Sequence, residues 1–130
     1  MNISRSYPPN IEKIKAVLPI RSTAVFTYFD TIYAPGISFQ LPDDLVAHER
    51  VHMTQQGSDA EGWWDKYLAD PKFRLSQEID AYRVQYRRFC QLRADRNERA
   101  RLLAMLASDL ASEMYGSIIS FRDALVEIKH

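Results

Sequence analysis

The stretch of sequence that decides the fold reads Asp43-Asp44-Leu45-Val46-Ala47-His48-Glu49-Arg50-Val51-His52-Met53-Thr54-Gln55-Gln56. It contains the pattern His-Glu-x-x-His, and residues four apart on a helix lie one above the other on the same face. His48 and His52 can therefore bind one metal ion between them. Glu49 lies on the flank of that face and can reach a water on the open side of the ion. The stretch supplies two metal ligands and a base, the set that metal-assisted hydrolysis requires.

The residues around this pattern favour a helix. Pro42 stops a preceding extended segment, Asp43 or Asp44 can cap the first turn, and Gly57 ends the helix. The alternative is a chance match on a surface helix, because three fixed letters in five positions are a modest signal. A third metal ligand elsewhere in the chain would favour the metal site.

That third ligand must come from outside the stretch. The only other histidine, His130, is the last residue of the sequence. The single cysteine, Cys90, cannot form a thiolate cluster alone. A carboxylate is therefore the expected third ligand.

The candidate carboxylate lies on a long second helix that we expect to begin at Pro71. Apolar residues recur along this helix at three- and four-residue steps and form one stripe: Leu75, Ile79, Tyr82, Tyr86, Phe89 and Cys90. Glu78 lies at the edge of the stripe, whereas Asp80 faces the opposite side and is predicted to be a solvated acid or a group behind the ligands. A carboxylate directed at the core is costly unless it is paired or bound to a metal. Glu78 is therefore the predicted ligand, and the alternative is an ion pair with Arg74 or Arg83.

The order His48-Glu49-x-x-His52, then 25 residues, then Glu78-Ile79-Asp80-Ala81 resembles the glutamate-ligand zincin metallopeptidases. Gln55 and the run from Glu78 to Tyr82 also resemble small metallopeptidases of bacteria and phages. The likeness covers roughly residues 31 to 86 and implies a minimal zinc-binding domain that hydrolyses peptide bonds. The chain departs from the large members, in which an Asp four residues after the ligand Glu orients a histidine, because Tyr82 stands at that position.

The expected mechanism is hydrolysis assisted by Zn²⁺. His48, His52 and Glu78 hold the ion, and Glu49 acts as general base. Tyr82 or Tyr33 is a candidate for helping to stabilise the oxyanion of the transition state. The expected substrate is a protein, or the peptide part of a cell wall.

The fold class we expect is α+β, mainly helical with a small N-terminal antiparallel sheet, in a single zincin-like domain over residues 1–130. A short helix over residues 11–18, which Asn10 can cap, precedes a meander of two or three strands over residues 24–29, 31–34 and, as the possible third, 37–41. Helices follow to the end of the sequence, with caps expected from a capping box at Ser58-Asp59-Ala60-Glu61, from Asp95 and from Ser120. The aromatic residues Trp63, Trp64 and Tyr67 are expected to pack against the two metal-bearing helices. The zincin resemblance implies an open edge strand that pairs with extended substrate, and residues 31–34 are the candidate. An ordinary hairpin without this role is the alternative.

Composition narrows the function classes. The formal net charge is zero, so no general affinity for nucleic acid or anionic membrane follows. One cysteine excludes an internal disulfide, and neither a signal peptide nor a membrane-span-length apolar run is visible. We expect a cytoplasmic or virion-borne protein.

Three hypotheses remain open from the sequence. The first is a peptidase. The second is a zinc-binding domain without turnover that serves as a structural or interaction module. The third is a helical nucleic-acid-binding protein, because seven arginines lie between Arg83 and Arg101. Such a run is also typical of the solvated face of packed helices.

Overall fold

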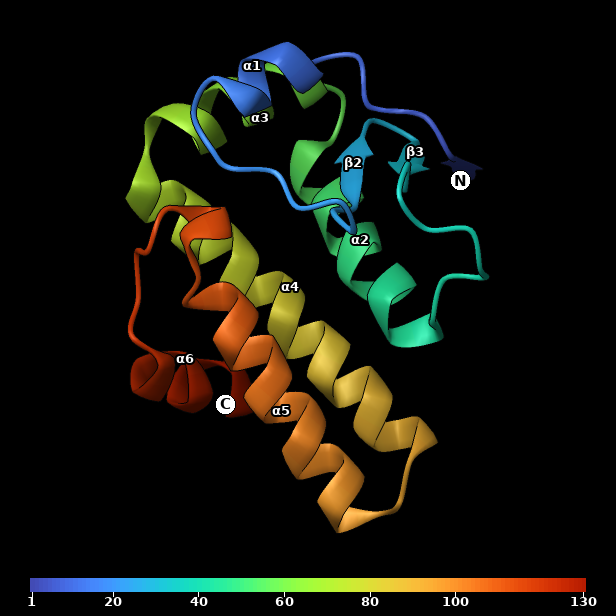
Figure 1. The fold of residues 1–130 in the computed structure, drawn as a ribbon, viewed down its shortest axis with the longest axis vertical. Coiled ribbons are helices and arrows are strands. Elements are labelled where there is room, and N and C mark those ends of the chain that lie inside the picture. The colour runs from blue at the N-terminus through green and yellow to red at the C-terminus, as the bar shows by residue number, and fades with distance from the viewer.

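The computed structural model describes residues 1–130 and is mainly helical with a small sheet, which confirms the α+β class (Figure 1). Its elements in chain order are β1 (Asn2–Ser4), α1 (Ile11–Lys15), β2 (Phe26–Tyr28), β3 (Thr31–Tyr33), α2 (Asp43–Gln56), α3 (Ala60–Ala69), α4 (Pro71–Leu92), α5 (Arg96–Leu110), the 3₁₀ helix η1 (Glu113–Tyr115) and α6 (Phe121–Lys129). The long helix α4 has α2 and α3 packed on it, together with α5 and α6 (Figure 1). The chain therefore places the His-bearing helix α2 directly against the Glu78-bearing helix α4.

The sheet is mixed, so the expected antiparallel sheet is wrong. Its strand order is β1-β3-β2, with β1 parallel to β3 and β2 antiparallel to it. Residues 31–34 are consequently not an open edge, because β1 occupies the outer side of β3. The pairing extends past the strand itself, since the Ala34 amide donates to the Ser4 carbonyl. The two edge strands are β1 and β2, and β2 is the one that packs against α2.

Residues 37–41 do not form the third strand that their composition predicts. Ile37 and Leu41 instead bury their side chains against Ile32. The Arg5 guanidinium donates to the carbonyl oxygens of Ile37 and Phe39, so a side chain takes the place of a neighbouring strand. Packing and this one cation outweigh the local preference for extended pairing.

Several helix boundaries confirm the expected signals. Pro71 is the first residue of α4, and the Asp70 carboxylate accepts from two amides of the first turn. Asp95 and Ser120 cap α5 and α6 in the same way. The cap of α3 is Asp59, which accepts from the Gly62 amide, and not Ser58 of the predicted capping box.

Two expected caps are wrong. The helix near the start covers only Ile11–Lys15, and the Asn10 side chain makes no capping bond. No side chain caps α2, which follows Pro42 directly. The His-bearing helix is therefore held by its contacts with the sheet and α4 and not by a side-chain cap.

The apolar core consists of three clusters that surround the buried polar residues of α2 and α4. One cluster joins α4, α5 and α6 through residues such as Leu106, Leu110 and Ile128. A second holds the expected aromatic residues of α3. The third lies under β3 around Ile32. No helix of the structure is both long and apolar enough to cross a membrane.

Candidate metal centre

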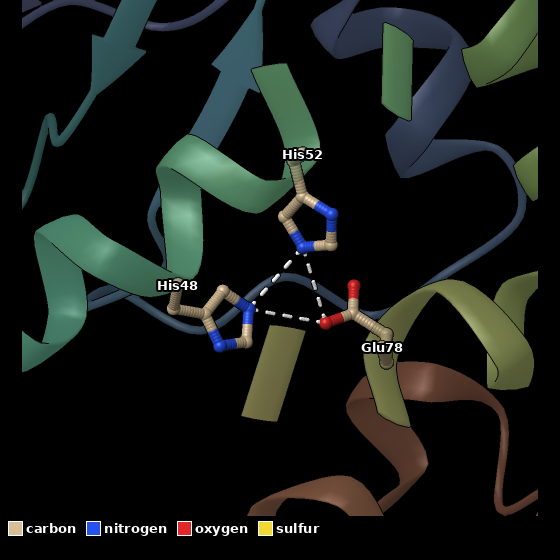
Figure 2. Close-up of side chains that lie close together, drawn as sticks. All are labelled: His48, His52 and Glu78. Atoms are coloured by element: carbon tan, nitrogen blue, oxygen red, sulfur yellow. Dashed lines mark hydrogen bonds and ion pairs between the residues drawn. The ribbon is translucent and has the colours of Figure 1, made fainter. Parts of the chain in front are cut away.

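Helices α2 and α4 bring His48, His52 and Glu78 together, as the sequence predicts (Figure 2). The Nε2 atoms of the two histidines are 3.2 Å apart. Glu78 Oε1 lies 3.1 Å from Nε2 of His48 and 3.2 Å from Nε2 of His52. All three residues are buried, with at most 5% of their surface exposed. Three metal-ligating atoms therefore converge on one point inside the protein.

The spacing of these atoms is suited to a small metal ion. Bonds of ~2.05 Å to a tetrahedral ion place neighbouring ligand atoms about 3.3 Å apart. The three observed separations are 3.1, 3.2 and 3.2 Å. The three residues would therefore hold a metal ion without rearrangement of the backbone.

Each ligand is in place for a local reason. The four-residue spacing puts His48 and His52 on one face of α2, and that face is buried together with Glu49 and Gln56. Glu78 sits on the buried side of α4, as its place at the edge of the apolar stripe predicts. The ion pair considered as an alternative for Glu78 is wrong, because its predicted partners bond elsewhere. Arg74 donates to backbone carbonyls, and Arg83 donates to Glu127.

The protonation states of His52 and Glu78 depend strongly on each other. Burial by itself lowers the pKa of His52, but the Glu78 carboxylate more than offsets this and raises the pKa to about 9. Burial by itself would raise the pKa of Glu78, yet the two imidazoles hold it well below its usual range. The centre thus favours a positive charge between its ligands, which a divalent cation supplies.

Glu49 lies beside the ligands as a buried carboxylate with 4% of its surface exposed. Its Oε2 atom is 3.7 Å from Nε2 of His48. The hydroxyl of Thr27 on β2 donates to its Oε1 atom over 2.9 Å. Burial raises the pKa of Glu49, against the opposing effect of the neighbouring imidazoles. The chain therefore holds a proton acceptor within a few ångströms of the ligand triangle.

Other hydrogen bonds hold the three ligands from behind. His48 Nδ1 is 2.9 Å from Oε1 of Gln85, and His52 Nδ1 is 2.8 Å from Oε1 of Gln55. The Tyr67 hydroxyl donates to Glu78 Oε2 over 2.6 Å. This bond occupies the carboxylate oxygen that faces away from the histidines.

Sequence reasoning missed Gln85, Tyr67 and Thr27. Gln85 follows Glu78 by seven residues, or two helical turns, so its place on the same face of α4 was available as a signal. Tyr67 was expected only as a packing residue of α3, and it fills that role as well. Thr27 lies on a strand whose approach to Glu49 is set by the packing of α2 on β2.

The three remaining predicted site residues have different positions. Tyr82 lies at the centre, with its ring edge-on to His48 at 4.5 Å between centroids and its hydroxyl 2.7 Å from that of Tyr115. Asp80 is exposed on the far side of α4. Tyr33 packs against the cluster of α1 and α3 and does not line the cavity at the centre. Of the three, only Tyr82 is brought to the ligands.

A cavity of about 310 Å³ adjoins the ligands and Glu49. Its walls are mostly apolar and come from the segment before β2, the start of α2, and the region of α5 and η1. Examples of these wall residues are Leu18, Ile20, Val25, Leu45, Met105 and Met114. The Arg21 guanidinium and the Asp109 carboxylate, 3.0 Å apart, join two of these walls. The centre is thus buried in the protein but accessible from a cavity.

Comparisons of the chain with models of known protein families, with curated proteins and with solved structures find no match. The geometry of the centre is therefore the basis for a functional assignment. It defines a buried His-His-Glu group that could hold a metal ion.

Proposed function

We propose that the protein is a zinc-dependent metallopeptidase, as the resemblance of its motifs to the zincins implies. The single observation that carries this proposal is the triangle of His48, His52 and Glu78 with Glu49 at its side. Two imidazoles and one carboxylate, with a further position left for water, form a donor set typical of catalytic zinc. Nitrogen ligands favour zinc over magnesium or calcium, which prefer oxygen.

The residues around the ion have distinct roles in this proposal. A bound zinc ion supplies Lewis acidity that makes water nucleophilic near neutral pH. Glu49 accepts the proton of the attacking water and later returns it to the leaving amine. Thr27 orients the Glu49 carboxylate, and the hydroxyls of Tyr82 and Tyr115 are available to a developing oxyanion.

The substrate in this proposal is an extended peptide that lies along β2. This strand pairs on one side only, and Phe26 and Thr27 line the cavity. Gln56 occupies one end of the free edge, because its amide bonds to the Thr27 carbonyl and the Phe29 amide. The backbone of Val25, farther along the same edge, forms no hydrogen bond within the chain and lines the cavity. Strand addition at Val25 would place a peptide next to the ligands.

The two other hypotheses have less support. The zinc-binding module without turnover is favoured by the missing Asp four residues after Glu78, but the amide of Gln85 contacts His48 in its place. The nucleic-acid hypothesis rests on the run of seven arginines, and several of these are engaged within the chain. Arg83 pairs with Glu127, Arg88 pairs with Asp43, and Arg99 donates to backbone carbonyls.

The test combines metal analysis with digestion of a peptide library. Protein purified without chelator should contain one zinc ion per chain, and Glu78→Gln should remove it. Glu49→Gln should keep the zinc and lower the rate of hydrolysis by about 10²-fold or more. Asp80→Asn, an exposed change two residues from Glu78, is the matched control and should keep both properties. Full hydrolysis by Glu49→Gln, or a zinc-loaded parent that cleaves nothing in the library, would contradict the proposal.

A further inference from the structure

The amide groups of two glutamines form a layer behind the metal ligands. Gln85 contacts His48 and Gln55 contacts His52, in each case at the ring nitrogen that faces away from the ligand triangle. What these amides do depends on which of their two polar atoms faces the ring. The inference below rests on the proposed zinc site.

The orientation of the Gln85 amide follows from its second partner. Its Nε2 group donates to Oδ2 of Asp44 over 2.9 Å. A carboxylate accepts hydrogen bonds, so the NH₂ end of the amide must face Asp44 and the oxygen must face His48. An amide oxygen has no proton to give, so Nδ1 of His48 must carry the hydrogen. The Nε2 atom of His48 is then the nitrogen with a lone pair for the metal.

The same reasoning applies to His52. The Nε2 group of Gln55 donates to the backbone carbonyl of Gln77 over 3.0 Å, and a carbonyl can only accept. The oxygen of Gln55 therefore faces His52, whose Nδ1 must carry the hydrogen. Both anchors, Asp44 and the Gln77 carbonyl, are themselves fixed in helices, α2 and α4 respectively.

We propose that Gln85, backed by Asp44, and Gln55 are positioning residues that hold both imidazoles with Nε2 toward the ion. Glu49 and Glu78 already place two carboxylates at this buried centre. A third carboxylate in direct contact with His48 would add negative charge that burial makes costly. The Gln85 amide instead lies between Asp44 and His48 and bonds to both. The negative charge of the half-buried Asp44 therefore stays one side chain away from His48.

The first experiment removes the amide oxygen. Gln85→Leu leaves Nδ1 of His48 without an acceptor, and the zinc affinity, measured by competition with a chromophoric chelator, should fall about 10- to 100-fold. Gln91→Leu, an exposed change on the same helix, is the matched control and should bind zinc like the parent. In ¹⁵N NMR spectra of the zinc-free protein, the chemical shifts of the His48 ring nitrogens should show the hydrogen on Nδ1 in the parent and a shift of that hydrogen toward Nε2 in Gln85→Leu. A loss of packing alone would not move a proton between ring nitrogens.

The second experiment reverses the direction of the hydrogen bond between residues 85 and 44. Gln85→Glu alone places two carboxylates against each other and should weaken zinc binding. Gln85→Glu combined with Asp44→Asn restores a donor facing an acceptor between residues 85 and 44 and should bind zinc more tightly than Gln85→Glu alone. Failure of the double variant to improve on Gln85→Glu would overturn the proposal.

Two further outcomes separate this inference from the proposed function. A parent that binds zinc no better than Gln85→Leu, or that carries the hydrogen of His48 on Nε2 in the zinc-free state, overturns the positioning role and leaves the peptidase untouched. If the parent binds zinc tightly and carries the hydrogen of His48 on Nδ1 but cleaves no peptide, the peptidase proposal is overturned. The positioning role of the two glutamines is then supported.

Discussion

The coupling between His52 and Glu78 predicts how the metal-free protein responds to pH. The perturbation is removal of the metal with a chelator, followed by a change of pH from about 6 to about 10. In the folded, metal-free state the pKa of His52 is raised to about 9, while a free histidine has 6.5. Because the folded-state pKa is the higher one, the stabilisation is fully present below pH 6.5. It is lost as the pH rises through about 9.

The magnitude follows from the gap between the two pKa values. Between pH 6.5 and about 9 the folded state binds one more proton than the unfolded state. The free energy of unfolding should therefore fall by ~1.4 kcal/mol per pH unit, or ~3 kcal/mol in all. This is a large part of the 5–15 kcal/mol typical of a whole domain, so about half the stability of a marginal fold depends on this one pair.

The assay is urea unfolding followed by tryptophan fluorescence at a series of pH values. Trp63 is a suitable reporter because it is buried with its ring 5.3 Å from that of His52. Glu78→Gln is the control, since it removes the carboxylate that raises the pKa while keeping the shape of the side chain. In the zinc-saturated protein the free energy of unfolding should also no longer depend on pH over this range, because the ion replaces the proton on Nε2 of His52. A metal-free parent whose stability is flat over this range, or falls no more steeply than Glu78→Gln, would refute the reasoning.

Three further predictions concern residues around the centre. Thr27→Val should keep the zinc but lower kcat in a peptide-cleavage assay, because the Glu49 carboxylate loses its 2.9 Å partner, and an unchanged kcat would contradict this role. Tyr67→Phe should weaken zinc binding about tenfold in chelator competition, because Glu78 loses the donor to its second oxygen, and parental affinity would count against it. Arg74→Met should lower the free energy of unfolding, measured with urea, by ~3 kcal/mol, because buried carbonyl groups lose their hydrogen-bond donor. A loss below ~1 kcal/mol would show that water replaces the guanidinium.

The sequence by itself determined those features that depend on one helix at a time. The four-residue spacing of His48 and His52 sets their common face whatever the helix packs against. Glu78 could be singled out from Asp80 because a helical stripe separates the buried from the exposed side. The residues that start helix α4, Asp70 and Pro71, likewise act within the first turn of that helix.

Only the tertiary structure decided which residues meet across elements. The strand β1 pairs with β3 over nearly thirty residues of chain, and three-residue strands carry too little pattern to reveal a parallel partner. The contacts of Thr27 with Glu49 and of Gln85 with Asp44 depend on the distance at which β2 and α4 pack against α2. Local spacing fixes the direction of a side chain relative to its own helix axis. The relative placement of two elements comes from apolar burial that is summed over the whole core, and no short stretch of sequence contains that sum.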